Sequence, residues 1–182
     1  MEYVVVAVAA LVLGWGIWVF NRLVSDRNLV AQAFADIDVQ LKRRADLVPQ
    51  LVETVRAYAA YERQTLQAVT ELRTRAATFT DRGPSASRFG AESELGTALS
   101  RLVLLQESYP ALKADQNFRD LATKLIDVED HLQSARRFYN GAVKQYITRL
   151  QTFPDVIIAR LFAFREAAFF ETDDRAGVQV TL

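Results

Sequence analysis

Residues 30–55 read VAQAFADIDVQLKRRADLVPQLVETV. Apolar side chains recur in this stretch at alternating intervals of four and three residues, as at Val30, Phe34 and Ile37, and the spacing continues as far as Phe79. A repeat of about 3.5 residues that holds over such a length is typical of helices that pack along a continuous seam, as in coiled coils. The stretch therefore predicts a long helix whose apolar stripe must be covered by other helices.

The helix predicted from this repeat covers residues 21–79. Pro49 lies inside it and is expected to kink it, because the proline ring removes a backbone hydrogen bond. Before it come residues 3–20, a run of eighteen residues without a charged side chain. At about 1.5 Å per helical residue the run reaches about 27 Å, close to the hydrocarbon core of a bilayer at about 30 Å. Since no flexible linker separates the two segments, we expect a membrane-spanning helix that continues directly into the long helix.

A cleavable signal peptide is the alternative interpretation of residues 3–20. Such a peptide has a positively charged leader and a shorter apolar stretch, whereas this chain has Glu2 and no Lys or Arg before the run. Aromatic side chains, which favour the two membrane interfaces, lie near the ends of the run and support a retained anchor. They are Tyr3, Trp15, Trp18 and Phe20.

The charges that flank the run predict its orientation. Arg22 and Arg27 follow it, and segments that carry Lys and Arg tend to stay in the cytoplasm. We therefore expect a single-pass protein with its N-terminus outside and the rest of the chain in the cytoplasm. Ala10 and Gly14 form a small-xxx-small pair that would let two anchors pack closely, which hints at a homo-oligomer.

Composition argues against several classes of function. The chain has 22 Lys and Arg against 22 Asp and Glu, and this balance argues against general nucleic-acid binding. It has no cysteine, and His131 is its one histidine, which rules out Cys-ligated zinc and multi-histidine metal sites. The cationic run Lys42–Arg44 spreads around a helix at about 100° per residue and forms no single basic face. We predict no cofactor, no metal and no nucleic-acid partner.

Turn-forming residues divide the rest of the chain into three more helices. We predict a loop over residues 81–90 and helices over residues 91–108, 115–153 and 154–170. Asp115 is predicted to cap the third of the four long segments, and Pro154 to open the last. The fold class is all-α, with an anchor at residues 1–21, an elongated antiparallel four-helix bundle at residues 22–171 and a flexible tail at residues 172–182.

Three pairs of opposite charges are predicted to set the register between the two long helices of the bundle. Arg44 and Glu62 fall on seam positions, where a paired charge can fix the alignment of helices. The residue numbers of the three pairs add up to nearly the same value, as one antiparallel register requires. The pairs are Arg44 with Glu129, Glu62 with Lys113, and Asp38 with Arg136.

The last predicted helix is apolar almost all round and must be covered by something. It can dock on the bundle, lie in the membrane interface or contact another subunit, and docking is the simplest of the three. The residues that would make this contact include Ile158, Phe162, Phe169 and Phe170.

Four blocks of the chain resemble the LemA family in order and spacing. They are IDVQLKRRADLVPQLV at residues 37–52, ESYPALKADQNF at residues 107–118, ARRFYN at residues 135–140, and the ending with Phe153–Pro154 and Phe169–Phe170. The resemblance covers residues 21–171. It implies a protein of a bacterial-type cell membrane with an N-terminal anchor and a cytoplasmic four-helix bundle. Members of the family have been linked to magnetosome membrane formation, to TPM-domain proteins and to a membrane metalloprotease.

The sequence thus favours a non-enzymatic membrane scaffold that self-associates through its bundle and organises or shapes the membrane. Its expected partners are membrane lipid, further copies of itself and a membrane protein. The main alternative is an adaptor that regulates a membrane protease or a TPM-domain partner during envelope stress. A more distant alternative is a hydrolase that uses carboxylates alone, such as Asp127, Glu129 and Asp130.

Overall fold

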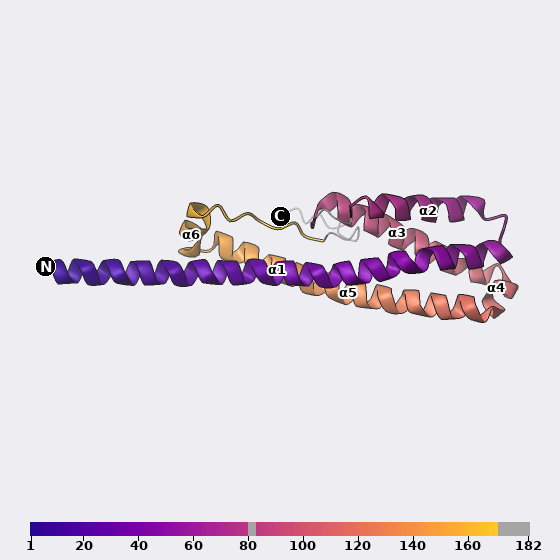
Figure 1. The fold of residues 1–182 in the computed structure, drawn as a ribbon, viewed down its shortest axis with the longest axis horizontal. Coiled ribbons are helices and arrows are strands. Elements are labelled where there is room, and N and C mark those ends of the chain that lie inside the picture. The colour runs from indigo at the N-terminus through magenta and orange to yellow at the C-terminus, as the bar shows by residue number, and fades with distance from the viewer. Residues whose placement is uncertain (80–82, 171–182) are drawn as a thin grey trace, which may run out of the picture. The chain divides into compact units, whose positions relative to one another are not determined.

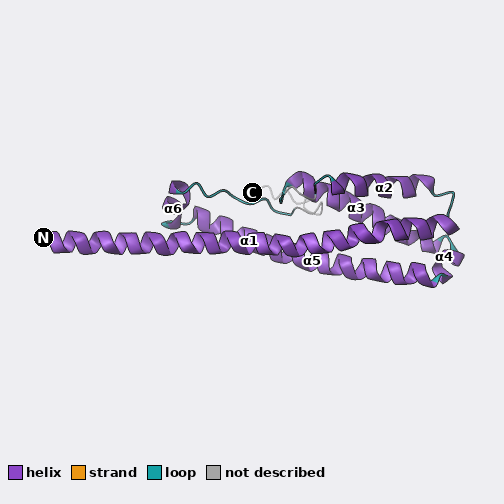
Figure 2. Cartoon of the chain, in the orientation of Figure 1, coloured by secondary structure: helices purple, strands orange, loops and turns teal. Residues whose placement is uncertain are grey.

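The computed structural model describes residues 1–79 and 83–170, and this part of the chain contains helices and no strand. The predicted all-α class is therefore confirmed (Figure 2). The tail predicted at residues 172–182 lies outside the described residues. The helices, coloured along the chain in Figure 1, are α1 Glu2–Tyr58, α2 Arg63–Ala77, α3 Ala86–Leu104, the 3₁₀ turn η1 Leu105–Glu107, α4 Pro110–Ala114, α5 Gln116–Gln151 and α6 Asp155–Leu161.

The chain divides into two compact units. The first unit comprises residues 1–35 and 137–169, and the second comprises residues 36–136 with Phe170. Helices α1 and α5 each contribute one part to the first unit and another part to the second.

Helix α1 is continuous from the apolar run into the seam, as predicted, and it includes Pro49. It ends at Tyr58, however, so the prediction of one helix to residue 79 is wrong. The chain turns at Ala59–Glu62, where the Glu62 amide donates to the Ala59 carbonyl at 3.0 Å, and α2 then begins. This turn contains neither Gly nor Pro, and the apolar spacing keeps its phase across it. Packing of α2 within the second unit makes the turn favourable, since Leu66 and Val69 lie in the core of that unit.

Helix α3 begins at Ala86, earlier than the predicted end of the loop near Gly90. The Ser85 hydroxyl accepts a hydrogen bond from the Arg88 amide at 3.3 Å and caps the helix. Phe89 is buried, so the first turn of α3 is part of the second unit's core rather than of a solvent loop.

Helix α5 begins as predicted. The Asp115 carboxylate accepts a hydrogen bond from the Phe118 amide at 2.7 Å, which is the geometry of a helix N-cap.

Helix α6 ends at Leu161, so the predicted helix over residues 154–170 is too long. Ala163 has a left-handed backbone, with φ at 52°. The amide of Ala163 donates to the Arg160 carbonyl, and the amide of Phe164 donates to the Ala159 carbonyl at 3.0 Å. These two bonds form a Schellman motif, which stops a helix.

Within each unit, α1 and α5 pack antiparallel. In the first unit the rings of Phe34 and Tyr139 lie 5.9 Å apart, and buried Asp26 accepts hydrogen bonds from Gln145 and Arg149. In the second unit Thr54 pairs with Asn117, and the Tyr58 hydroxyl donates to Asp115 at 2.8 Å. Within each unit the residue numbers of the partners add up to nearly the same value, as antiparallel packing of two helices requires. The second unit's core contains the side chains Val48, Leu51, Val55, Leu66, Val69, Leu95, Leu99, Leu102, Phe118, Leu121 and Leu125, among others.

Candidate functional site

Most of the apolar run at the start of α1 is exposed. Its 18-residue window has a mean hydropathy of 2.3, and only 6% of it is buried. A core helix of comparable hydropathy would be mostly covered by protein, because exposed apolar surface is costly in water. Within the described residues, α1 is the one helix long and apolar enough to cross a membrane.

The predicted interface aromatics lie at different depths in the first unit. Tyr3 is exposed near the start of α1, and Trp15 is half-buried. Trp18 is exposed, with the Arg22 guanidinium 5.2 Å from its ring centre. The ring centres of Phe20 and Phe162 lie 4.8 Å apart in an edge-to-face arrangement. The end of the apolar run thus contacts the segment that follows α6.

Helix α6 is docked on α1 by one side only. Ile158 and Ala159 are buried, and Ile158 Cδ1 lies 3.7 Å from the position that a Cβ on Gly16 would occupy. On the other side, Ile157 and Leu161 have relative exposures of 52% and 72%. The apolar surface of this helix is therefore only partly covered in the isolated chain, and the side that carries Ile157 and Leu161 still lacks the cover that its composition predicts.

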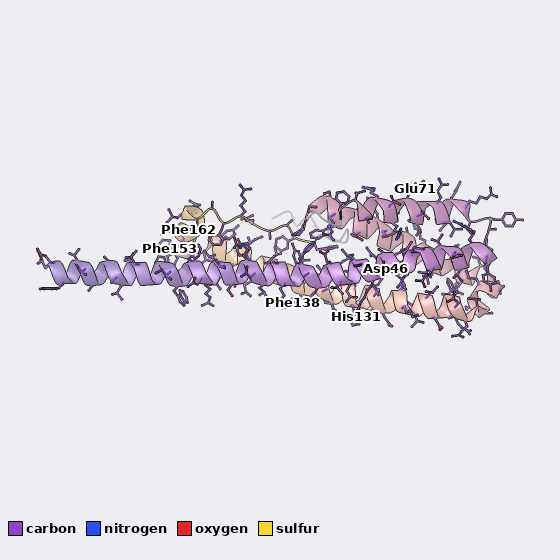
Figure 3. The ribbon with its side chains drawn as sticks, in the orientation of Figure 1. Asp46, Glu71, His131, Phe138, Phe153 and Phe162 are labelled. Atoms are coloured by element: carbon purple, nitrogen blue, oxygen red, sulfur yellow. The ribbon has the colours of Figure 1, made fainter. Side chains whose placement is uncertain are left out.

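Other aromatic side chains that flank this helix in the sequence divide between surface and core. Phe153 is 76% exposed and Phe162 55% exposed, and both are labelled beside α6 in Figure 3. Phe169 is exposed. Phe170 is buried in the second unit, where it stacks on Phe89 with ring centres 4.1 Å apart.

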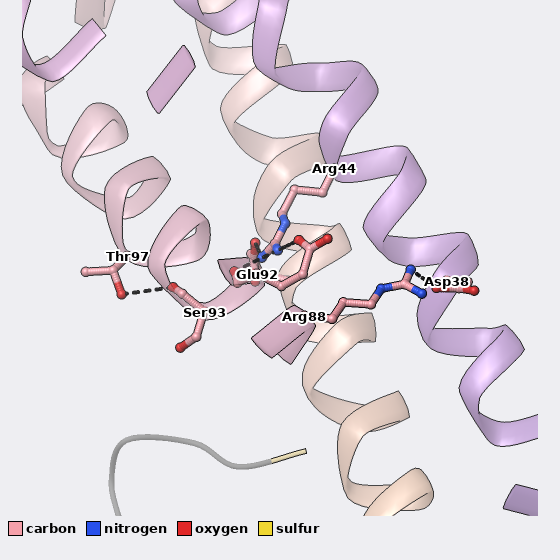
Figure 4. A network of polar contacts seen from close by, with 7 residues as sticks. Asp38, Arg44, Arg88, Glu92, Ser93 and Thr97 are labelled. Carbon is pink, nitrogen blue, oxygen red and sulfur yellow. Dashed lines mark hydrogen bonds and ion pairs between the residues drawn. The ribbon is translucent and has the colours of Figure 1, made fainter. Parts of the chain in front are cut away.

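A cluster of buried charges joins three helices of the second unit (Figure 4). The Arg44 side chain of α1 is fully buried. Its Nη2 donates to the Glu92 carboxylate of α3 at 2.5 Å and to the Glu92 carbonyl at 2.8 Å. Its Nη1 donates to Glu129 of α5 at 2.9 Å. Two carboxylates therefore face the buried Arg44 cation and accept hydrogen bonds from both of its terminal nitrogens, whereas its Nε has no hydrogen-bond partner among the described residues.

The structure brings together one of the three predicted charge pairs, Arg44 with Glu129. Asp38 pairs with Arg88 of α3 instead of Arg136 (Figure 4).

The third predicted pair also has other partners. Glu62 accepts a hydrogen bond from the Tyr109 hydroxyl at 3.0 Å, and Lys113 pairs with Glu107 at 3.0 Å.

Sequence reasoning missed Arg88 because it placed residues up to 90 in a loop. It missed Glu92, which lies in the predicted helix over residues 91–108, because charge partners were sought only between the two long helices of the bundle. Arg88 and Glu92 are four residues apart, so both side chains lie on one face of α3. A predicted helix that began before Arg88 would have shown this pattern.

Burial and neighbouring charges shift several ionisable groups of the second unit. Burial, with the nearby Arg44 cation, lowers the pKa of Arg136 to about 10, although Glu129 and Glu92 oppose the change. Arg136 stays cationic at neutral pH and lies 4.2 Å from the centre of the Phe170 ring. Burial raises the pKa of Asp38, and the Arg88 guanidinium limits the rise.

Hydrogen bonds at the start of α5 act in the opposite direction on Asp115. The Phe118 amide and the Tyr58 hydroxyl both donate to its carboxylate and lower its pKa. The hydrogen bond to Asp115 raises the pKa of the Tyr58 hydroxyl.

No group of three or more His, Asp and Glu side chains gathers as a metal site in the described part of the chain. Asp127, Asp130 and His131 are exposed along α5, whereas Glu129 is engaged with Arg44. The three carboxylates considered for hydrolysis therefore do not converge on a common buried site.

Comparison with known proteins matches the model of the LemA family to residues 33–181. The magnetosome proteins MamQ 1 and MamQ 2 of Paramagnetospirillum magneticum are each 23% identical, with 84% of this chain covered. The chain spans 64% of the length of each. Protein LemA of Metamycoplasma hominis is 24% identical, with 88% of this chain and 72% of that protein covered. With the exposed apolar helix, these likenesses suggest a membrane-associated protein.

Proposed function

The chain belongs to the LemA family, and on this premise we propose that it is a non-enzymatic scaffold anchored in a membrane by the apolar start of α1. The observation that carries the proposal is the continuity of α1. One uninterrupted helix includes both the exposed apolar run and the seam residues buried in the second unit. A bundle attached in this way has no loop between it and its anchor.

The ionised interior supports a structural role. Each buried cation of the second unit contacts carboxylates or an aromatic ring of the same chain, as Arg44 and Arg136 illustrate. These contacts connect the helices of the unit. No pair of carboxylates among the described residues faces a buried cavity that a substrate would enter. The bundle would then act through its surface.

The proposed surface contacts are with further copies of the chain. Gly14 has open space around it, so a second anchor could approach closely at the Ala10 and Gly14 positions. Arg22 and Arg27 after the run favour a cytoplasmic bundle. Since two of the similar proteins are named as magnetosome proteins, we extend the proposal to a role in organising membrane.

Size-exclusion chromatography with light scattering on the full chain in detergent tests the scaffold. We expect homo-oligomers larger than a dimer, and bilayer deformation when the same protein is imaged in lipid. Gly14→Leu should reduce the oligomer size, whereas Val12→Leu, at a position that is already large and exposed, should not. A monomer that recovers a membrane protease in pull-down would overturn the scaffold in favour of the adaptor.

A further inference from the structure

We propose that the exposed apolar face formed by Phe153, Ile157, Leu161 and Phe162 is a second membrane contact, which inserts into the lipid interface beside the anchor. We call these four residues the α6 face. The inference rests on the proposed membrane anchor and adds a second site of lipid binding to it.

The α6 face is apolar and solvent-exposed in the isolated chain. Its four side chains are between 52% and 76% exposed and include no charge. Ile157 and Leu161 are one helical turn apart and so lie on the same side of α6. Ala159, on the opposite side of the helix, and Ile158 are buried, and Phe162, one turn after Ile158, contacts Phe20 while it remains 55% exposed. A further contact must therefore use the α6 face.

The position of α6 along α1 identifies lipid as the occupant. Ile158 packs at Gly16 and Phe162 at Phe20, so α6 lies level with the last turn of the apolar run. One helical turn is about 5.4 Å, which falls within the depth of about 5–10 Å at which interfacial helices are immersed. On α1, Ile17 and Trp18 are exposed apolar residues within the same stretch, between Gly16 and Phe20. The same solvent should cover them and the α6 face.

Charges near the α6 face match a headgroup layer. Arg22 lies over the Trp18 ring at the end of the apolar run, and Arg27, about two helical turns further along α1, lies 5.6 Å from the centre of the Phe164 ring. Arg160 and Arg165 are exposed nearby in the sequence. Long cationic side chains can reach lipid phosphates while their stems remain on apolar surface.

The neighbouring acidic groups do not oppose this contact. Asp155 pairs with Arg149 at 3.6 Å, and Glu166 accepts a hydrogen bond from Gln151 at 2.9 Å. Both carboxylates are thus directed to partners within the first unit.

The chain has no cysteine, so single cysteines can report the position of each site without background. We suggest Ile157→Cys and Leu161→Cys in the full chain, labelled with an environment-sensitive fluorophore in vesicles of phosphatidylcholine and phosphatidylglycerol that contain doxyl-labelled lipid. Phe138→Cys is the matched control, because Phe138 belongs to the same unit and is 54% exposed, close to the 52% of Ile157. Leu11→Cys reports the anchor itself. Circular dichroism checks that each labelled protein is folded.

The lipid contact predicts several-fold stronger quenching at 157 and 161 than at 138, together with strong quenching at 11. Quenching at 11 with 157 and 161 no different from 138 would overturn the second contact and leave the anchor intact. Absence of quenching at 11 would overturn the anchor. Disulfide formation between copies at 157 or 161, without lipid quenching, would assign the α6 face to a second copy and overturn the inference.

Discussion

Single residues hold the second unit in register, and Arg44 is the clearest case. Its guanidinium contacts Glu92 and Glu129, so one side chain of α1 is tied to both α3 and α5. Gly96 of α3 makes room for this arrangement, because a Cβ at that position would lie 3.1 Å from Arg44 Nη1. A contact this close requires the guanidinium to move.

The substitution Gly96→Ala should therefore destabilise the protein relative to Gly90→Ala. Gly90 lies on the same helix with nothing within 4 Å of an added Cβ, so alanine there should stabilise the helix by about 0.5–1 kcal/mol. At Gly96 the displaced buried cation should offset that gain and cost about 1–3 kcal/mol. Urea unfolding followed by circular dichroism measures both variants. Equal stabilisation by the two would show that Arg44 adapts without cost.

Ala163 carries a local cost at the end of α6. It is the one residue other than glycine with a positive φ in the described part of the chain. An L-residue in the left-handed region is less stable than glycine there by about 1–2 kcal/mol. Ala163→Gly should therefore raise the melting temperature. Ala167→Gly, which lies outside the helices and has no positive φ, should not raise it, and an equal rise for both would contradict the explanation.

At the scale of elements, the N-cap of α5 links stability to pH. Asp115 accepts hydrogen bonds from the Phe118 amide and the Tyr58 hydroxyl, and its pKa is lowered in the folded protein. A carboxyl whose pKa is lower when folded contributes stability above its unfolded pKa of about 3.9. That contribution is lost as the pH falls through the lower, folded pKa.

Asp115→Asn keeps a capping side chain but removes the charge. We expect the variant to be less stable than the parent at neutral pH, and the difference to shrink as the pH falls below about 4. Urea unfolding at a series of pH values measures it. A stability difference that stays constant over the whole series would show that the carboxylate's charge is not the cause.

At the scale of the whole molecule, the exposed apolar run sets where the chain resides. Val8→Arg combined with Leu11→Arg places two cations in the middle of the run, where each costs about 2.5–3.5 kcal/mol in a membrane. The variant should shift from the membrane fraction to the soluble fraction on cell fractionation.

The matched control for this shift is Leu104→Arg combined with Ile126→Arg. Both positions are exposed on helices of the second unit. This variant should remain with the membrane. Release of both variants alike would indicate general instability instead of loss of the anchor.

Local patterns in the chain were sufficient to predict the all-α class, the continuity of α1 from the apolar run into the seam, and the start of α5 at Asp115. Those features depend on neighbouring residues, namely a repeat, an uncharged stretch and a capping side chain. The opposite charges of Arg44 and Glu129 also predicted their contact, because the residue numbers of facing residues in two antiparallel helices add up to nearly the same value.

Other features depended on packing between distant segments. The turn at Ala59–Glu62 has no breaker residue, and it forms because α2 gains burial beside α3. Asp38 pairs with Arg88 of α3. The seam pattern did not predict that α3 lies beside α1. The end of α6 requires a left-handed alanine, which no propensity favours. Periodicity records which side of a helix is apolar, but it does not record which partner covers that side, because burial is a property of the assembled chain.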